Sequence, residues 1–158
     1  MSNTEKILLA IQVLSTLIIA ATFAVYFLQL KAMRSASTAQ NILALVNFLQ
    51  AVEVREARLE VRTTLKQKEL KLWDKEDERR ASLVCATYDL AAILMRSGLV
   101  PTEVFIQNWA ASIKDCHDVC EPFIRRMQRL PENSNMGYWD NFDWLYEQVL
   151  STHPTPSA

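Results

Sequence analysis

The side chains best suited to chemistry gather in one short stretch of the sequence. Cys116 and Cys120 lie four residues apart, which places them on one face of a helix, and His117 lies three residues before Cys120. Thiols and imidazoles bind zinc, or act together as a nucleophile and its base. A structural zinc site takes four ligands, however, and adjacent side chains such as Cys116 and His117 point about 100° apart on a helix. We therefore predict that the protein is not an enzyme and that it has no catalytic residue, metal site or cofactor. The alternative is a membrane-tethered enzyme or metal-binding protein that uses these three residues.

A stripe of basic residues is the second group with chemical potential. At about 100° per residue, Arg55, Arg62 and Lys66 fall within about 40° of one another, and Arg58 lies about 60° from Arg55. Such one-sided charge binds an anion, such as a nucleotide phosphate or anionic lipid, or pairs with acidic helices of the same fold or of another subunit. Internal pairing is the competing interpretation. We predict a weak anion-binding site, which a second basic cluster could join in space: Arg55, Arg58, Arg62, Lys66, Arg125 and Arg126.

Composition narrows the function further. The chain has two glycines in 158 residues, which excludes the Gly-rich phosphate loops and nucleophile elbows of many enzymes. Its 17 basic and 18 acidic side chains exclude a strongly basic nucleic-acid-binding protein, so no nucleic-acid partner is expected. Three cysteines are an odd number and imply no disulfide framework.

The elements that must position these groups begin with a long apolar segment. The 24 residues Ile7–Leu30 carry no charge. As a helix they would span roughly 36 Å, enough for a hydrocarbon core of about 30 Å. A cleavable signal peptide has a shorter apolar core and a basic region before it, whereas only Lys6 precedes this segment, beside Glu5. We predict an uncleaved transmembrane helix.

The charges that flank this segment predict its orientation. Lys31 and Arg34 follow the segment directly, and no acidic residue follows until Glu53. Because basic residues are retained on the cytoplasmic side, we expect the N-terminus outside and the C-terminal part in the cytoplasm.

Polar residues inside the apolar segment fall within an arc of about 140° on a helix. Chance together with residues at the membrane interface would explain the arc, and a water-lined pore is a further alternative. A third interpretation is a face that packs against identical helices, because polar side chains form hydrogen bonds between transmembrane helices. We predict that this face makes a homo-oligomer through Gln12, Ser15, Thr16 and Thr22.

The rest of the chain has a helical pattern throughout, and the first helix should extend from about Thr38 to Lys71, where Gly and Pro are absent. A heptad-like seam in it joins Leu43, Asn47, Gln50, Val54, Ala57, Val61 and Leu65. We predict an all-α protein in which a single N-terminal transmembrane helix precedes a cytoplasmic bundle of about four helices. Its parts are a tail and transmembrane helix (1–30), a juxtamembrane charged helix (31–71), a helical bundle (72–150) and a flexible tail (151–158).

Three further helices complete the predicted bundle. The first, over about Glu76–Ser97, begins with acidic residues and ends at Gly98, a left-handed C-cap. The second begins with Thr102 as its N-cap and is kinked or interrupted by Pro122. A loop at 131–137 precedes the last, over 139–150.

The order of these features resembles a known family. The apolar segment precedes an Arg cluster, then Gly98-Leu99-Val100, Trp109, Pro122-Phe123-Ile124-Arg125-Arg126 and the aromatic residues Tyr138, Trp139 and Phe142. This order is similar to that of a bacterial family described only as a domain of unknown function (four-seven-six-zero). The resemblance implies a small bacterial protein anchored in the inner membrane, and it supplies no reaction.

These observations predict a non-enzymatic, single-pass membrane protein. Its cytoplasmic bundle would mediate homo-oligomerisation and contacts with a partner protein or an anionic small molecule. A signalling or defence effector, in which an anionic messenger binds Arg55, Arg58 and Arg62, is the sharper form of this hypothesis.

Overall fold

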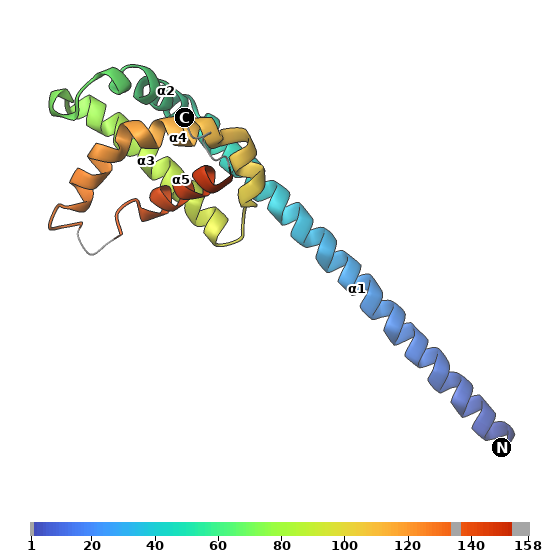
Figure 1. The fold of residues 1–158 in the computed structure, drawn as a ribbon. Helices are drawn as coiled ribbons and strands as arrows, with labels where there is room; N and C mark the ends of the chain where they lie inside the picture. The colour runs from blue at the N-terminus through green and yellow to red at the C-terminus, as the bar shows by residue number, and fades with distance from the viewer. Residues whose placement is uncertain (1, 134–136, 153–158) are drawn as a thin grey trace. The chain divides into compact units, whose positions relative to one another are not determined.

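The computed structural model describes residues 2–133 and 137–152, which contain five α-helices, two short 3₁₀ helices and no strand (Figure 1). This confirms the predicted all-α class. The chain divides into two units, Met1–Gln40 and Asn41–Ala158, which are described separately below.

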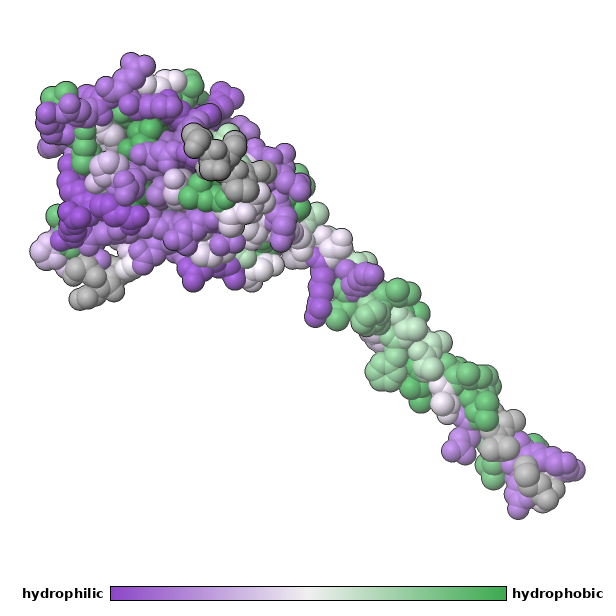
Figure 2. All heavy atoms as spheres, viewed as in Figure 1, coloured by the Kyte–Doolittle hydropathy of each residue, from purple (hydrophilic) through white to green (hydrophobic). Residues whose placement is uncertain are grey.

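The first unit is made of helix α1 (Asn3–Gln50), whose last turns belong to the second unit. Its most apolar 18-residue window has a mean hydropathy of 2.3, and none of that window is buried. Hydrophobic residues predominate along this exposed part of α1, whereas hydrophilic residues predominate on the visible surface of the second unit (Figure 2). By length and composition alone, α1 is able to cross a membrane.

The second unit packs the end of α1 with α2 (Val52–Thr63), α3 (Lys75–Arg96), α4 (Thr102–Gln128) and α5 (Asp140–Thr152). Helix α3 contacts α2, α4 and α5, and α4 contacts α2 and α5. The largest fully buried side chains come from all of these helices and include Leu49, Leu65, Tyr88, Ile113, Phe123 and Phe142. A single hydrophobic core therefore holds the unit together.

The predicted helix over 38–71 is broken at Ala51, which has φ −52° and ψ 138°. The break changes the helix phase. In an unbroken helix Leu49 and Val54 would point about 140° apart, whereas both are buried here. The residues predicted to form the seam are buried only after the break: Val54, Ala57, Val61 and Leu65. Before the break, Leu43, Asn47 and Gln50 are exposed.

Helix α2 also ends earlier than predicted, at Thr63, and two 3₁₀ helices (Leu65–Gln67 and Leu70–Leu72) replace its expected last turns. The connection between α2 and α3 contains no Gly or Pro and is held by side-chain contacts. The Trp73 indole donates to the carbonyl oxygen of Lys68 at 3.1 Å, and the Lys68 ammonium pairs with Asp77. The Trp73 ring also contacts Phe123 of α4, with 5.6 Å between the ring centres. This last contact joins residues far apart in the sequence, so helical periodicity does not reveal it.

Helix α3 has the ends that its sequence predicts. The Asp74 carboxylate accepts hydrogen bonds from the backbone N–H groups of Glu76 and Asp77, and the Asp77 carboxylate accepts one from the N–H of Asp74. This capping box satisfies N–H groups that the first turn leaves free. At the other end, Gly98 has φ +72°, which confirms the left-handed C-cap.

Helix α4 differs from prediction at its start and at Pro122, and α5 extends over Asp140–Thr152 instead of 139–150. Pro101 rather than Thr102 is the N-cap of α4: its backbone is extended, with ψ 124°, and its carbonyl oxygen accepts a hydrogen bond from the N–H of Phe105 at 3.4 Å. The helix continues through Pro122 instead of being interrupted there. Residues 134–136 of the predicted loop and 153–158 of the predicted tail lie outside the described residues.

Candidate functional site: a cavity beside a buried arginine

A cavity of about 1020 Å³ lies within the second unit, between the last turns of α1, helix α2 and the first half of α4. The amide of Asn41 on α1 donates to the carbonyl oxygen of Leu99 at 3.2 Å and ties α1 to the turn before α4. The lining is mixed and consists of Ile42, Leu45, Val46, Gln50, Arg55, Glu56, Arg58, Leu59, Arg62, Val100, Val104, Phe105, Asn108, Trp109 and Ser112.

Arg58 distinguishes this cavity from the rest of the molecule. Its side chain lies on the core-facing side of α2, beside Ala57 and between Val54 and Val61, and the residue is only 6% exposed. Its Nη1 atom is the one buried side-chain nitrogen or oxygen among the described residues that has no hydrogen-bond partner. A buried polar group without a partner is costly, and more so when it is charged. Nη1 is closed to solvent, so a small shift of the Arg58 side chain toward the cavity would let an anion there satisfy it.

The walls around Arg58 hold its guanidinium in place. Its central carbon lies 4.6 Å from the centre of the Trp109 ring, a cation–π contact, and Phe105 stacks on Trp109 at 5.9 Å. Behind these residues the Tyr88 hydroxyl donates to the Ser112 hydroxyl at 2.8 Å. Burial raises the pKa of Tyr88, which the positive charge of Arg58 offsets in part, so Tyr88 stays neutral and cannot neutralise Arg58.

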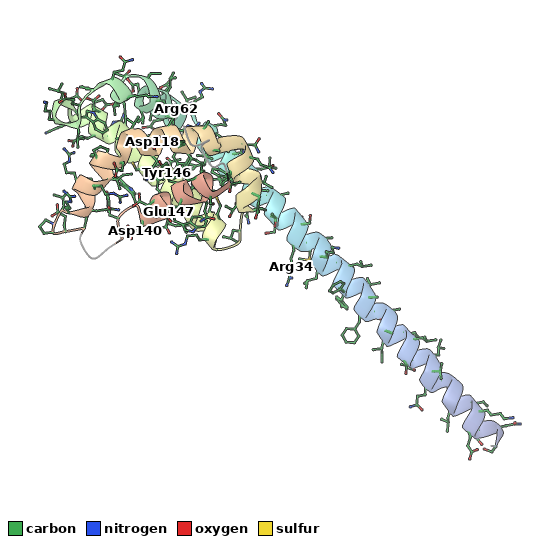
Figure 3. All side chains as sticks on the ribbon, in the orientation of Figure 1. Arg34, Arg62, Asp118, Asp140, Tyr146 and Glu147 are labelled. Atoms are coloured by element: carbon green, nitrogen blue, oxygen red, sulfur yellow. The ribbon has the colours of Figure 1, made fainter. Side chains whose placement is uncertain are left out.

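The other charges of the cavity leave one positive charge uncompensated. Arg62, which is labelled in Figure 3, donates from Nε and Nη2 to the carboxylate of Asp115 on α4, at 3.0 and 2.7 Å, so this arginine pairs within the fold. Arg55 and Glu56 are exposed at the rim and carry opposite charges. With Arg62 offset by Asp115, and Arg55 by Glu56, the charge of Arg58 remains.

The structure separates the remaining predicted anion ligands from this cavity. Lys66 is exposed and does not line it. Arg125 donates to Asp143 at 2.6 Å, and Arg126 donates to Glu78 at 2.6 Å. The second basic cluster therefore pairs within the fold, and three of the six predicted residues, Arg55, Arg58 and Arg62, come together.

The Cys116, His117 and Cys120 group lies in the core rather than in a reactive cleft. Both thiols are fully buried, and burial raises the pKa of Cys116 to about 12, which disfavours the thiolate that attacks substrates and binds metals. The buried His117 ring stacks on Tyr146 at 4.0 Å, and its Nε2 atom lies 2.7 Å from Asp143. Among the described residues, there is no group of three or more His, Cys, Asp or Glu side chains that could hold a metal ion.

Asp143 links this core to a smaller cavity of about 430 Å³ between α4 and α5, where Asp118, Tyr146 and Glu147 are found (Figure 3). Burial by itself would raise the pKa of Asp143. The hydrogen bonds from His117 and Arg125 outweigh this effect and lower the pKa to about 2. Because these partners already satisfy the carboxylate, the network stabilises the packing of α5 on α4.

A family model places the chain among known proteins. The model is described as a domain of unknown function, DUF4760, and it matches residues 16–149. The chain belongs to the DUF4760 family. This confirms the resemblance found in the sequence. No curated protein and no solved structure matches the chain.

Along α1 of this DUF4760 protein, the residues predicted for self-association are all exposed. The hydroxyls of Thr16 and Thr22 donate to the carbonyl oxygens of Gln12 and Ile18, each at 2.8 Å. These bonds satisfy both hydroxyls within their own helix. Self-association through Gln12, Ser15, Thr16 and Thr22 stays a prediction.

Sequence reasoning did not foresee that Trp109 and Phe105 line this cavity, although both also belong to or pack against the hydrophobic core. It also grouped Arg58 with the rest of the basic stripe, whose exposure it left open, whereas Arg58 is buried. Its position between Val54 and Val61, at helical spacings of four and three, was the available signal that this arginine faces the core.

The Asp143 network predicts a loss of stability in acid. Because the folded pKa of Asp143 lies near 2 and its ordinary value is 3.8, its stabilising effect is present above about pH 4 and is lost as the pH falls toward 2. We expect the Tm of the wild type to fall over this range more than that of Asp143→Asn, measured by circular dichroism. Glu132→Gln, which removes an exposed carboxyl, should follow the wild type. Parallel curves for wild type and Asp143→Asn would contradict this role.

Proposed function

We propose that this protein is a non-enzymatic, single-pass membrane protein whose cytoplasmic helical domain binds a small organic anion in the cavity beside Arg58. The observation that carries the proposal is the unpartnered Nη1 atom of Arg58, buried next to a cavity of about 1020 Å³. Binding pockets for small molecules are mostly apolar and contain a few polar groups that orient the ligand, which fits this lining.

The comparison with other arginines supports a binding role for Arg58. Arg62, Arg79, Arg80, Arg125 and Arg126 each form an ion pair with an acidic residue of the same chain. Arg58 is more buried than any of them and forms no ion pair among the described residues. Stability alone would favour an apolar residue at this position, because an isolated charge is expensive to bury. Ligand binding explains why an arginine is present.

The apolar part of α1 supports the membrane anchor. Side chains such as Ile7, Phe23 and Phe27 are 59–71% exposed within a segment that has no charge, and lipid would cover this surface. The basic residues Lys31 and Arg34, which follow this segment, support our proposal that the second unit lies in the cytoplasm, at the inner membrane of a bacterium. In this proposal, self-association of the spans would bring several ligand-binding domains together, as a signalling or defence effector requires.

The anchor is tested by extraction of membranes from cells that express the full chain. We expect the protein to stay in the pellet after a wash with alkaline carbonate and to enter the supernatant only with detergent, because the apolar segment is surrounded by lipid. Ile18→Arg combined with Ile19→Arg should reduce the pelleted fraction, since each arginine costs about 2.5–3.5 kcal/mol at the centre of a span. Leu43→Arg, outside the segment, is the control. Wild-type protein in the detergent-free supernatant would contradict the anchor.

Anion binding is tested by thermal unfolding of the full chain in nanodiscs of neutral lipid. The probes are three water-soluble organic anions that carry one charge each: octanoate, benzenesulfonate and cyclic AMP. We expect at least one probe to raise the Tm of the wild type, because a ligand that binds only the folded state stabilises it. The Arg58→Gln variant should lose this shift.

Arg129→Gln is the matched control for this experiment. It removes the same charge from an exposed position at the end of α4, away from the cavity. It should respond to the probes as the wild type does. If no probe changes the Tm of the wild type, or if Arg58→Gln and the wild type respond equally, the proposed site is wrong.

A further inference from the structure

We infer that the ligand is an amphiphile with one negative charge and an aliphatic chain, such as the carboxylate of a medium- or long-chain fatty acid. This inference rests on the proposed function and specifies the ligand of the same cavity. It follows from the charge that the cavity leaves uncompensated, from the kind of apolar side chain in its walls and from its size.

The charge of the cavity fits a single anionic group. Arg58 offers one buried nitrogen, Nη1, whose N–H groups have no partner among the described residues, and the Arg62 guanidinium is already bonded through two nitrogens to Asp115. Arg55 and Glu56 at the rim carry opposite charges, so the rim adds no net positive charge for a second anionic group. A ligand with several phosphates would therefore find too few partners, whereas one carboxylate would pair with the free N–H of Arg58.

The walls favour an aliphatic chain over a flat ring. Five aliphatic side chains from three elements, together with Val100, line the cavity: Ile42, Leu45, Val46, Leu59 and Val104. The aromatic rings in the wall, Trp109 and Phe105, already stack on each other, and Trp109 also contacts the Arg58 guanidinium. The rings are thus engaged in holding Arg58, and the aliphatic surface is what remains for the ligand.

The exposed apolar residue at the mouth of the cavity supports the same conclusion. Leu59 lines the cavity and is nevertheless 63% exposed. A chain that enters past Leu59 would cover this surface while its carboxylate reaches Arg58, one residue earlier on α2. The volume of about 1020 Å³ is at the upper end of the range for small-molecule pockets, so it accommodates a chain of this kind.

The four tryptophans provide a direct test, because all of them lie in the second unit and only Trp109 lines this cavity. Bromine quenches tryptophan fluorescence at short range. We would titrate the full chain in neutral nanodiscs at pH 8 with 11-bromoundecanoate, and in parallel with 11-bromoundecan-1-ol. The alcohol has the same chain and enters the bilayer too, but it has no charge.

We expect saturable quenching by the bromoundecanoate that unbrominated dodecanoate reverses, and only weak, non-saturating quenching by the alcohol. Trp109→Phe should remove the saturable component. Arg58→Gln should raise the half-saturating concentration at least about tenfold, as expected for the loss of a hydrogen bond between charged groups. Arg129→Gln should behave as the wild type.

The possible failures are distinguishable. Equal quenching by acid and alcohol in the wild type would overturn the inference, and this comparison does not depend on the folding of any variant. If cyclic AMP or benzenesulfonate stabilises the wild type but bromoundecanoate gives no saturable quenching, the aliphatic ligand is wrong and anion binding stands. If no anion binds in either experiment, both proposals fail.

Discussion

The cavity depends on one physical constraint, which is that a permanently charged guanidinium is buried without a full set of partners. An arginine cannot escape this situation by losing its proton, as a buried lysine or histidine can. The fold reduces the penalty through the cation–π contact of Arg58 with Trp109, and the Trp109 ring in turn stacks on Phe105. It does not remove the penalty, because Nη1 has no acceptor among the described residues.

The break at Ala51 is what makes room for this arrangement. An uninterrupted helix from α1 into α2 could not bury both Leu49 and Val54, which would point about 140° apart. With the break, the last turns of α1 and helix α2 each bury apolar side chains in the core of the second unit, and the cavity lies between these two segments and α4. The elements that hold Arg58 in the core and those that shape the cavity are therefore the same.

Much of this architecture could be predicted from local sequence signals, and the rest depends on contacts that those signals do not carry. The acidic start of α3 and Gly98 at its end specify its limits well, because caps are local interactions. The early end of α2 accompanies the packing of Trp73 on Phe123, which is distant in the sequence, and the break at Ala51 accompanies the burial of both Leu49 and Val54. Arg55, Arg58 and Arg62 of the basic stripe line one cavity, whereas Arg125 and Arg126 pair with acidic residues that only the folded chain brings near.

The most direct test is the free energy of unfolding of the protein without ligand, measured for the wild type and Arg58→Met. Methionine keeps an unbranched apolar side chain and removes the charge. If Arg58 is retained for an anion, its burial weakens the empty protein, and Arg58→Met should be at least as stable as the wild type, by up to about 1–4 kcal/mol more. If Arg58 is instead an ordinary structural residue of the core, the variant should lose about 2 kcal/mol or more, and this result would contradict the account.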